Sequence, residues 1–145
     1  MRRILFLALF SLMIAGCATK AGPDSAARSR DPQAVLSKTW QWRETITPVE
    51  KIAVPNPERY TIRLLNDGKL QARFDCNNGG GNYQISAGKL SFGPLMSTRM
   101  ACPPGSLDAA YTRDLQRVVS FFVQDGDLYL ELPVDSGTMR FQPAP

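Results

Sequence analysis

Three cysteines, Cys17, Cys76 and Cys102, are the residues whose type and spacing most clearly indicate chemistry in this chain of 145 residues. An odd number of cysteines needs an explanation, because pairing into disulfides leaves one thiol over. Cys76 and Cys102 could form a disulfide in an oxidising compartment, or they could remain as two buried free thiols. A disulfide between them would stabilise the fold by about 3–4 kcal/mol in the chain-entropy model. Because the sequence contains no Cys-x-x-Cys motif, redox catalysis is not expected.

The side chains that most enzymes use for acid–base and metal chemistry are missing or scattered. The chain has no histidine, which excludes histidine-based triads and removes the commonest metal ligand. Serines and carboxylates are present, but nothing in their spacing brings a nucleophile to a base or two carboxylates together. The sequence therefore predicts no catalytic residues, no metal site and no cofactor. Although the formal net charge is +4, no run of Lys and Arg indicates nucleic acid as a partner.

Two polar segments around Cys76 could bind a ligand, and each also has a structural interpretation. The glycine-rich run at residues 77–82 could cradle a phosphate, but a strand follows it and no Gly-Lys-Ser/Thr is present. We therefore expect a tight bend in which glycine and asparagine adopt positive φ. Asp75, with Arg73 and Arg99 nearby if the disulfide forms, could make a polar pocket or belong to a solvated strand face.

The first seventeen residues have the pattern of a lipoprotein secretion signal. Arg2 and Arg3 precede an apolar run at residues 4–14, which is shorter than the about 20 residues that span a membrane. The run ends in Ile14-Ala-Gly-Cys17, which resembles the lipobox of bacterial lipoproteins. The resemblance implies cleavage after residue 16 and a diacylglyceryl thioether, with palmitate-type acyl chains, on Cys17. An ordinary signal peptide with a chance cysteine is the alternative.

The expected domain organisation follows from this N-terminus. Residues 1–16 form the signal peptide, residues 17–36 form the lipidated N-terminus and a flexible tether, and residues 37–143 form one domain. In lipoproteins of the enterobacterial type, the residue after the lipidated cysteine influences which membrane the protein reaches. Here that residue is Ala18 and not an aspartate, which resembles the pattern of outer-membrane lipoproteins. We therefore expect a cell-envelope protein that is anchored to the outer membrane through Cys17, with its domain facing the periplasm.

Hydrophobic periodicity after residue 37 is mostly that of β-strands. Trp40 and Trp42 lie on one face of an alternating segment, 38–45, where they could belong to the core or stack on sugar or lipid. Prolines at positions 48, 55 and 57 predict a long loop at residues 46–58. Further strands, several joined by Asp-Gly or Ala-Gly turns, are expected at residues 59–65, 70–74, 83–85, 89–92, 95–101, 120–124, 127–132 and 138–141.

One segment changes to the period of a helix. Leu107, Tyr111 and Leu115 recur at helical spacing between residues 104 and 119. Ser106 is expected to cap the N-terminus of this helix, and charged residues such as Asp114 are expected on its surface. The sequence therefore predicts an α+β, mainly β fold, in which about eight antiparallel strands form one curved sheet with a single packed helix.

Two segments resemble the signature of the META domain family, also called HslJ-like. Phe74-Asp-Cys-Asn-Asn-Gly-Gly-Gly-Asn-Tyr83 is similar to its Cys-Asn, glycine-rich and Tyr motif, and Ser97-Thr-Arg-Met-Ala-Cys102 is similar to its Thr-x-Met-Ala-Cys segment. The resemblance covers about residues 36–142. The matching residues, whose role we expect to be structural, are Asn77, Gly79, Gly81, Tyr83, Thr98, Met100 and Ala101.

The resemblance implies a fold and narrows the function. It implies a cracked β-barrel or strongly curved sheet with a helix packed across it, similar in shape to the lipid-binding pilotin lipoproteins of type III secretion. The family has no established catalytic activity, and some members are linked to heat shock and novobiocin tolerance. The family often has a glutamate early in the helix, where this chain has Ala109-Ala-Tyr111, so a role resting on that carboxylate is in doubt.

Three functions remain open from the sequence. The first is a non-catalytic envelope lipoprotein, expected to be monomeric, that binds a protein partner or an acyl chain and supports envelope stress or antibiotic tolerance. The second is a periplasmic inhibitor of lysozyme or another hydrolase, with the glycine-rich run or the 46–58 loop inserted into the cleft of the enzyme. The third is an enzyme, such as a lipid or cell-wall hydrolase, which would have to work without histidine.

Overall fold

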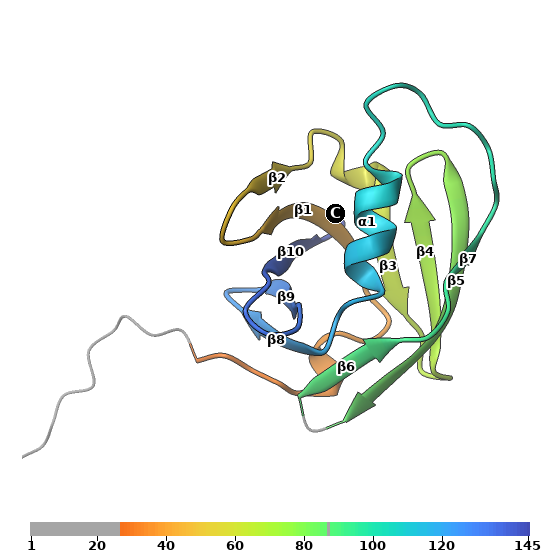
Figure 1. Ribbon diagram of the computed structural model, residues 1–145. Coiled ribbons are helices and arrows are strands. Elements are labelled where there is room, and N and C mark those ends of the chain that lie inside the picture. Colours follow the sequence, from red (N-terminus) through yellow and green to blue (C-terminus); the bar gives the residue numbers. More distant parts are fainter. Residues whose placement is uncertain (1–26, 87) are drawn as a thin grey trace, which may run out of the picture.

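Strands with one apolar and one polar face form the wall of a closed antiparallel β-barrel, and a helix packs across its opening (Figure 1). This computed structural model describes residues 27–86 and 88–145. The expected signal peptide, Cys17 and the first part of the expected tether lie outside the described residues, as does Ala87 of an expected turn. Within the described part of the chain, no helix is long and apolar enough to cross a membrane.

Eight strands make up the barrel wall in the order β1-β3-β4-β5-β6-β8-β9-β10, and β10 pairs back with β1. Two more strands extend this wall, because β2 pairs with β1 and β7 pairs with β5. The strands are β1 (Thr39–Ile46), β2 (Lys51–Ala53), β3 (Tyr60–Leu64), β4 (Lys69–Phe74), β5 (Asn77–Ser86), β6 (Lys89–Phe92), β7 (Met96–Ser97), β8 (Ser120–Gln124), β9 (Asp127–Glu131) and β10 (Thr138–Pro143). The helical segments are α1 (Asp108–Leu115) and the short 3-10 helices η1 (Pro32–Ala34) and η2 (Pro57–Arg59). The predicted α+β, mainly β fold is confirmed, and the sheet closes into a barrel.

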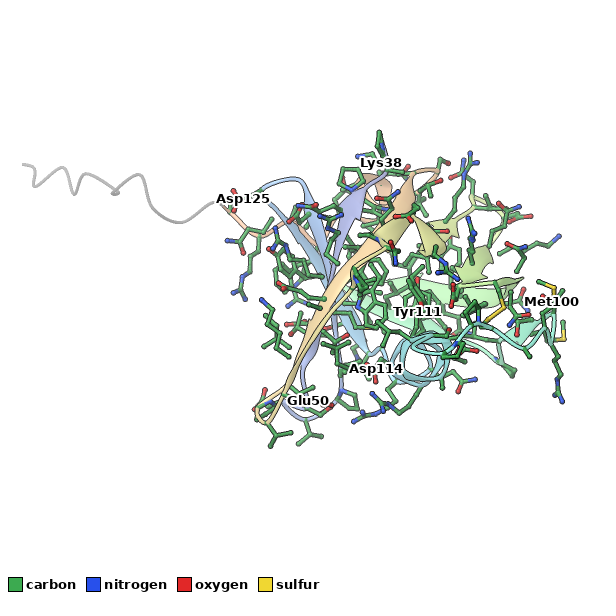
Figure 2. All side chains as sticks on the ribbon, turned by 90° about the horizontal axis from the view of Figure 1, so that it is seen from above. Lys38, Glu50, Met100, Tyr111, Asp114 and Asp125 are labelled. Atoms are coloured by element: carbon green, nitrogen blue, oxygen red, sulfur yellow. A yellow bond between two sulfur atoms is a disulfide. The ribbon has the colours of Figure 1, made fainter. Side chains whose placement is uncertain are left out.

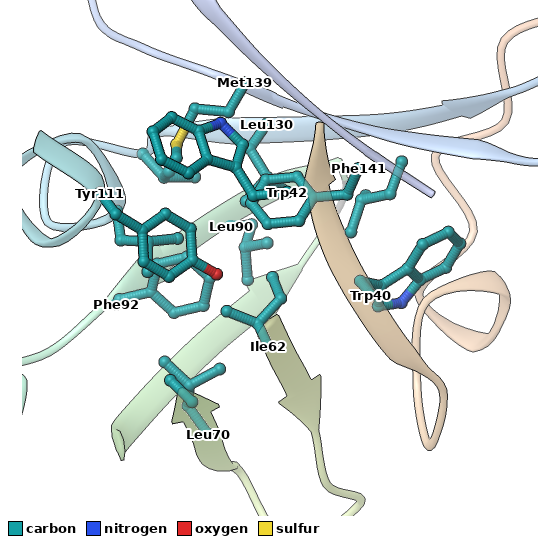
Figure 3. Close-up of a cluster of buried hydrophobic side chains, with 14 of the residues drawn as sticks. Trp40, Trp42, Ile62, Leu70, Leu90, Phe92, Tyr111, Leu130, Met139 and Phe141 are labelled. Carbon is teal, nitrogen blue, oxygen red and sulfur yellow. The ribbon is translucent and has the colours of Figure 1, made fainter. Parts of the chain in front are cut away.

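The inside of the barrel is filled by large apolar side chains (Figure 3). Trp40 and Trp42 are 1% and 0% exposed, which confirms that both tryptophans belong to the core. Tyr111 reaches in from α1, stacks on Trp42 with 4.9 Å between ring centroids and meets Tyr60 edge-on at 5.6 Å. Buried aromatic pairs of this kind add about 0.5–1.5 kcal/mol each beyond the area that they bury. These aromatic contacts therefore hold α1 against the barrel. The interior of the barrel is occupied by protein side chains.

The barrel wall has a seam between β6 and β8, where only Lys89 and Ser120 are paired. Beside this seam, the backbone of Ser29 exchanges two hydrogen bonds with Val123 of β8, at 2.9 and 2.8 Å. Val35 is fully buried in the core. The chain therefore already packs on the domain at Ser29 and Val35, where the sequence predicts a flexible tether up to residue 36. Backbone pairing holds Ser29 in place, and apolar burial holds Val35.

The expected loop at residues 46–58 contains a hairpin instead. β1 continues to Ile46, and β2 pairs back onto it. Thr47 turns the chain, because its hydroxyl accepts hydrogen bonds from the backbone N–H groups of Val49 and Glu50. The prolines flank the short strand β2 without entering it, so they do not prevent its pairing. Figure 2 shows this hairpin projecting from the barrel with Glu50 near its tip.

Two further segments are shorter than the sequence predicts. Of residues 95–101, only β7 is a strand, and it continues the line of β6 along the same strand, β5. The helix spans Asp108–Leu115 instead of residues 104–119, because the backbone N–H groups of Arg117 and Val118 bond three residues back and tighten the chain into a different turn.

The two ends of the helix differ from expectation in their polar contacts. Leu107, not Ser106, occupies the N-cap, although the Ser106 hydroxyl accepts a hydrogen bond from Asp108 N–H at 3.3 Å. Asp114, expected at the surface, is 1% exposed. Its Oδ1 accepts a hydrogen bond from Arg113 Nε at 2.8 Å, and this contact raises the pKa of the Arg113 guanidinium above its ordinary value. The arginine therefore compensates for the burial of Oδ1, while Oδ2 has no hydrogen-bond partner among the described residues.

Candidate functional site

A disulfide joins Cys76 to Cys102, with 2.02 Å between the sulfur atoms. Of the two states left open by the sequence, the paired one is therefore present. Cys76 lies in the two-residue turn between β4 and β5, and Cys102 lies in the loop that leads from β7 to α1. The bond ties that loop to the end of the glycine-rich strand. It holds together the two motifs that the resemblance singled out.

Asn77 makes most of the remaining contacts between these two motifs. Its Oδ1 accepts hydrogen bonds from the Thr98 hydroxyl at 2.9 Å and from the Met100 backbone N–H at 2.8 Å. Its Nδ2 donates to the Met100 carbonyl at 3.1 Å, and the side chain is 5% exposed. A buried amide with this many partners specifies one position for the neighbouring segment. These hydrogen bonds thus hold the two motifs together, through Asn77, Thr98 and the backbone of Met100.

Tyr83 and the exposed residues of the second motif take different places. The Tyr83 hydroxyl donates to the Leu65 carbonyl at 2.6 Å and ties β5 to the end of β3. Burial, with a smaller contribution from the Asp67 carboxylate, raises the pKa of the Tyr83 phenol. The side chain of Met100 is 58% exposed, and Ala101 is also exposed. Figure 2 shows Met100 at the end of the molecule opposite Asp125.

The glycines of the first motif form part of β5, so the expected tight bend with positive φ is wrong for Gly79 and Gly81. A Cβ atom on Gly79 would lie 1.9 Å from the Met96 carbonyl oxygen, and one on Gly80 would lie 1.9 Å from the Leu70 carbonyl oxygen. The backbones of β4 and β7 therefore lie so close to β5 that there is no room for a side chain at Gly79 or Gly80. The bend beside the cysteine is instead made by Asp75, whose φ is 61°.

The expected polar pocket at Asp75 exists with a different partner. The Asp75 carboxylate is 1% exposed and pairs with Arg59, while Arg73 donates from Nε to the backbone carbonyl of Asp75 at 2.9 Å. Arg99 is exposed and forms no ion pair with this carboxylate among the described residues. A polar cavity of about 120 Å³ lies beside the pair, between the η2 region and the loop before α1. The ion pair places the Arg59 charge beside the buried carboxylate, although Asp75 Oδ1 has no hydrogen-bond partner among the described residues.

An open hollow lies on the outside of the barrel, over the glycines of β5. It has a volume of about 550 Å³. Its floor is the backbone of residues 79–81, and its walls include Lys69 and Gln71 on one side and Pro94 and Met96 on the other. A second hollow of about 280 Å³ adjoins it, because Gln71 and Asn78 line both. We call the two hollows together the glycine groove.

The charged side chains that line the glycine groove are all positive. The outward positions of β3 and β4 carry Arg63, Lys69 and Arg73, and no carboxylate. Arg63 forms no ion pair with any described residue. Lys69 meets only Asp67, at 3.6 Å, and both side chains are more than half exposed. The groove therefore offers Arg63 without an ion pair among the described residues and Lys69 with only an exposed one, to Asp67.

Two further observations concern the chemistry of the described residues. Within this part of the chain no cluster of His, Cys, Asp or Glu could hold a metal ion. Tyr111 has a buried hydroxyl without a hydrogen-bond partner, and burial raises its pKa well above the ordinary value. The phenol thus stays protonated at neutral pH, inside the core and away from the groove.

The sequence reasoning missed the glycine groove. Each of its cations occupies the solvent side of a regularly alternating strand, where a charged residue is ordinary. A usable signal was present in the composition of two neighbouring segments, 59–65 and 69–74, whose outward positions hold basic and amide residues but no acidic residue. That signal becomes meaningful only once both strands are known to share one face.

Comparisons with known proteins agree with this fold. The chain matches the META domain family over residues 33–145. It is similar to a protein from Burkholderia xenovorans whose structure was determined by NMR, with 29% identity, coverage of 86% of this chain and 98% of that chain, and a TM-score of 0.65. It also shares its fold with a DUF4847 family protein from Bacteroides vulgatus, at 12% identity, 76% and 94% coverage and a TM-score of 0.58. No curated protein matches the chain. The protein belongs to the META domain family.

Proposed function

We propose that this protein is a non-catalytic outer-membrane lipoprotein that is anchored through Cys17 and binds a partner protein on the outside of its barrel, in the periplasm. The lipobox-like Ile14–Cys17 segment supports the anchor. The Cys76–Cys102 disulfide is in keeping with an oxidising compartment. Support of envelope stress or antibiotic tolerance is the role that the family resemblance favours.

The observation that carries the proposal is the contrast between a filled interior and a hollowed exterior. Trp42, Tyr111 and Phe141 are each 0% exposed and lie in contact inside the barrel. An acyl chain could enter there only by displacing several of these rings, at a cost of about 3–5 kcal/mol for each large side chain unpacked. The groove of about 550 Å³ over β5 needs no such rearrangement. A surface-bound protein partner is thus favoured over a buried lipid.

Absence of catalysis is part of the proposal. Among the described residues, the buried carboxylates Asp75 and Asp114 each pair with an arginine. Neither lies in the glycine groove. A binding function uses what the groove contains, namely cations, amides and exposed apolar side chains.

Site-specific photo-crosslinking in intact cells tests the partner. A photoreactive amino acid replaces Met96, which is 77% exposed at the groove wall, and in a matched strain it replaces Val134, which is 96% exposed in the β9–β10 loop outside the groove. We expect a discrete crosslinked product from position 96 and not from position 134. Equal products from both positions, or none from position 96, would reject a partner in the groove.

The anchor is tested separately with Cys17→Ser. The variant should lose incorporation of labelled palmitate and should leave the outer-membrane fraction. A variant that keeps its label and its membrane association would show that the lipobox interpretation is wrong.

An inhibitor of lysozyme or another hydrolase is the second candidate, and the β1–β2 hairpin favours it. This hairpin projects from the barrel (Figure 2), and Val49 at its turn is 91% exposed, as suits an element that fills a cleft. The glycine-rich run is no longer available for this role, because β7 pairs along it. Purified protein should then slow lysozyme, and Val49→Asp should relieve the inhibition. Unchanged lysozyme activity at saturating protein dismisses this candidate.

A further inference from the structure

We infer that the glycine groove binds an extended, acidic segment of its partner protein. This inference rests on the proposed function, which says only that a partner binds there, and adds the chemistry that the partner must present. Three features carry it: the register of the side chains, their unneutralised charge, and the apolar wall beside them.

The strand register sets the side chains of the groove in two neighbouring rows. Arg63 lies opposite Gln71, which lies opposite Gly80. In the next row, Thr61 lies opposite Arg73, and Arg73 opposite Asn78. Directly opposed side chains on an antiparallel sheet stand about 4.5–5.5 Å apart. The two guanidinium groups therefore sit on adjacent rows, with amides beside them.

The charge in these rows is available to a ligand. Arg63 is exposed and unpaired among the described residues, and Arg73 uses only its Nε, on a backbone carbonyl. An arginine fork that is not already paired can take a carboxylate through two parallel hydrogen bonds. Lys69 adds a third cation at the other end of the groove floor. Among the described residues, no carboxylate lines the groove, and the one carboxylate in an ion pair with these cations is Asp67, which lies 3.6 Å from Lys69.

The remaining lining selects an acidic peptide over a phosphate-bearing membrane surface. Pro94 and Met96 form an apolar wall on the side of the floor opposite Lys69 and Gln71, and the floor is bare backbone at residues 79–81. An extended peptide can place carboxylates on the arginines, its amide groups on Gln71 and Asn78, and an apolar side chain against Met96. A membrane headgroup would use the cations and leave the apolar wall uncovered. The mixed lining therefore fits a peptide with both acidic and apolar residues.

Fluorescence anisotropy tests this with the full chain purified from membranes in detergent. The probes are a labelled peptide of alternating Glu and Leu residues and a matched peptide of alternating Lys and Leu. We expect the acidic peptide to bind and the basic one to fail. Arg63→Glu should weaken binding of the acidic peptide about tenfold, because one attraction becomes a repulsion. Arg117→Glu, the same charge change at an exposed arginine outside the groove, should leave binding within about twofold.

Several results would overturn the inference. They are equal binding of both peptides, equal effects of Arg63→Glu and Arg117→Glu, or binding to phosphatidylglycerol vesicles with no binding of the acidic peptide. Arg63→Gln serves as a milder second variant, and circular dichroism confirms that each variant is folded. If position 96 crosslinks to a partner whose bound segment is neutral or basic, the inference fails and the proposed function stands. If position 96 crosslinks to nothing, the proposed function fails as well.

Discussion

The charged side chains of the strands on one outer face of the barrel form ion pairs with one another, whereas those of the strands on another outer face do not. On the face formed by β8, β9, β10 and β1, Arg140 donates to Asp127 at 2.7 Å and lies 3.5 Å from Glu44, which also pairs with Lys51 at 2.7 Å. On the face formed by β3, β4 and β5, the cations have open sides and the strands carry no carboxylate. We call the first the ion-paired face, and the second contains the glycine groove.

The difference indicates that the two faces have different roles. On the ion-paired face, side chains satisfy one another and contribute to the fold. At the glycine groove, the fold is held by backbone contact at Gly79, by the buried amide of Asn77 and by the disulfide. Because those elements do not need the exposed side chains, Arg63 and Gln71 are free to contact a partner.

The largest loss of stability should come from adding a side chain at Gly79, where the backbone of β7 lies close to β5. Gly79→Ala places a Cβ 1.9 Å from the Met96 carbonyl oxygen and should lower the free energy of unfolding by about 3 kcal/mol or more. Gly93→Ala is the matched control, since its Cβ would lie 3.5 Å from the nearest atom, an ordinary contact. Urea denaturation followed by tryptophan fluorescence measures both. Equal losses for the two variants would remove the close approach as the reason for these glycines.

Removing the disulfide should have the next largest effect. The double variant Cys76→Ala/Cys102→Ala frees a loop that the bond now closes, so the free energy of unfolding should fall by about 3 kcal/mol. Reduction of the unaltered protein with dithiothreitol should reproduce that loss in the same denaturation experiment. If neither treatment changes the midpoint, the bond does not stabilise the groove.

A smaller loss is expected from the amide that fastens the two motifs. Asn77→Ala leaves the Met100 backbone N–H and carbonyl without their partner and should cost about 2 kcal/mol. Asn78→Ala, at the exposed neighbouring position, should cost less than about 0.5 kcal/mol. Thermal denaturation compares the two, and a greater loss at position 78 would contradict the assignment.

The smallest effect belongs to the ion-paired face and depends on pH. The hydrogen bond from Lys51, together with the charges of Lys51 and Arg140, holds the pKa of the Glu44 carboxyl below its ordinary value. Stability from this group is therefore complete above about pH 4.3 and is lost as the pH falls through the lowered pKa. Glu44→Gln should lower stability by less than about 1 kcal/mol at neutral pH and by nothing in strong acid.

Denaturation over a range of pH checks that prediction. Glu58→Gln is the control, because Glu58 is exposed and forms no ion pair within the described residues. Its stability curve should run parallel to that of the unaltered protein. A Glu44→Gln difference that stays constant into acid would mean that the ion pairs on this face do not contribute.

Local sequence patterns predicted the barrel strands well because local physics determines them. Alternation placed Trp40 and Trp42 in the core, and Asp67-Gly68 and Asp125-Gly126 each form the turn of a hairpin. Gly68 and Gly126 adopt φ values of 80° and 83°, which those turns require. The disulfide was one of two open states, and the redox argument favoured the state that is present.

What the sequence did not reveal depends on contacts between distant segments. The run of three glycines predicts a tight bend, yet here it lies in a strand that neighbouring backbone approaches closely. Only the positions of Met96 and Leu70 make that visible. Likewise, Glu44 and Arg140 belong to the first and last strands of the barrel and meet because β1 pairs with β10. The glycine groove is defined by this kind of long-range pairing, so no local pattern could have located it.

The central claim is that this barrel works through its outer face and not through its interior, and amide NMR of the labelled protein tests it most directly. The acidic peptide probe is titrated while the backbone amides of Arg63, Gln71 and Gly80 and the indole N–H of Trp42 are followed. The account predicts that the groove amides shift and that the Trp42 signal, from a side chain with 0% exposure, stays in place. A shift of the Trp42 indole with unchanged groove amides would place the ligand inside the barrel and contradict the account.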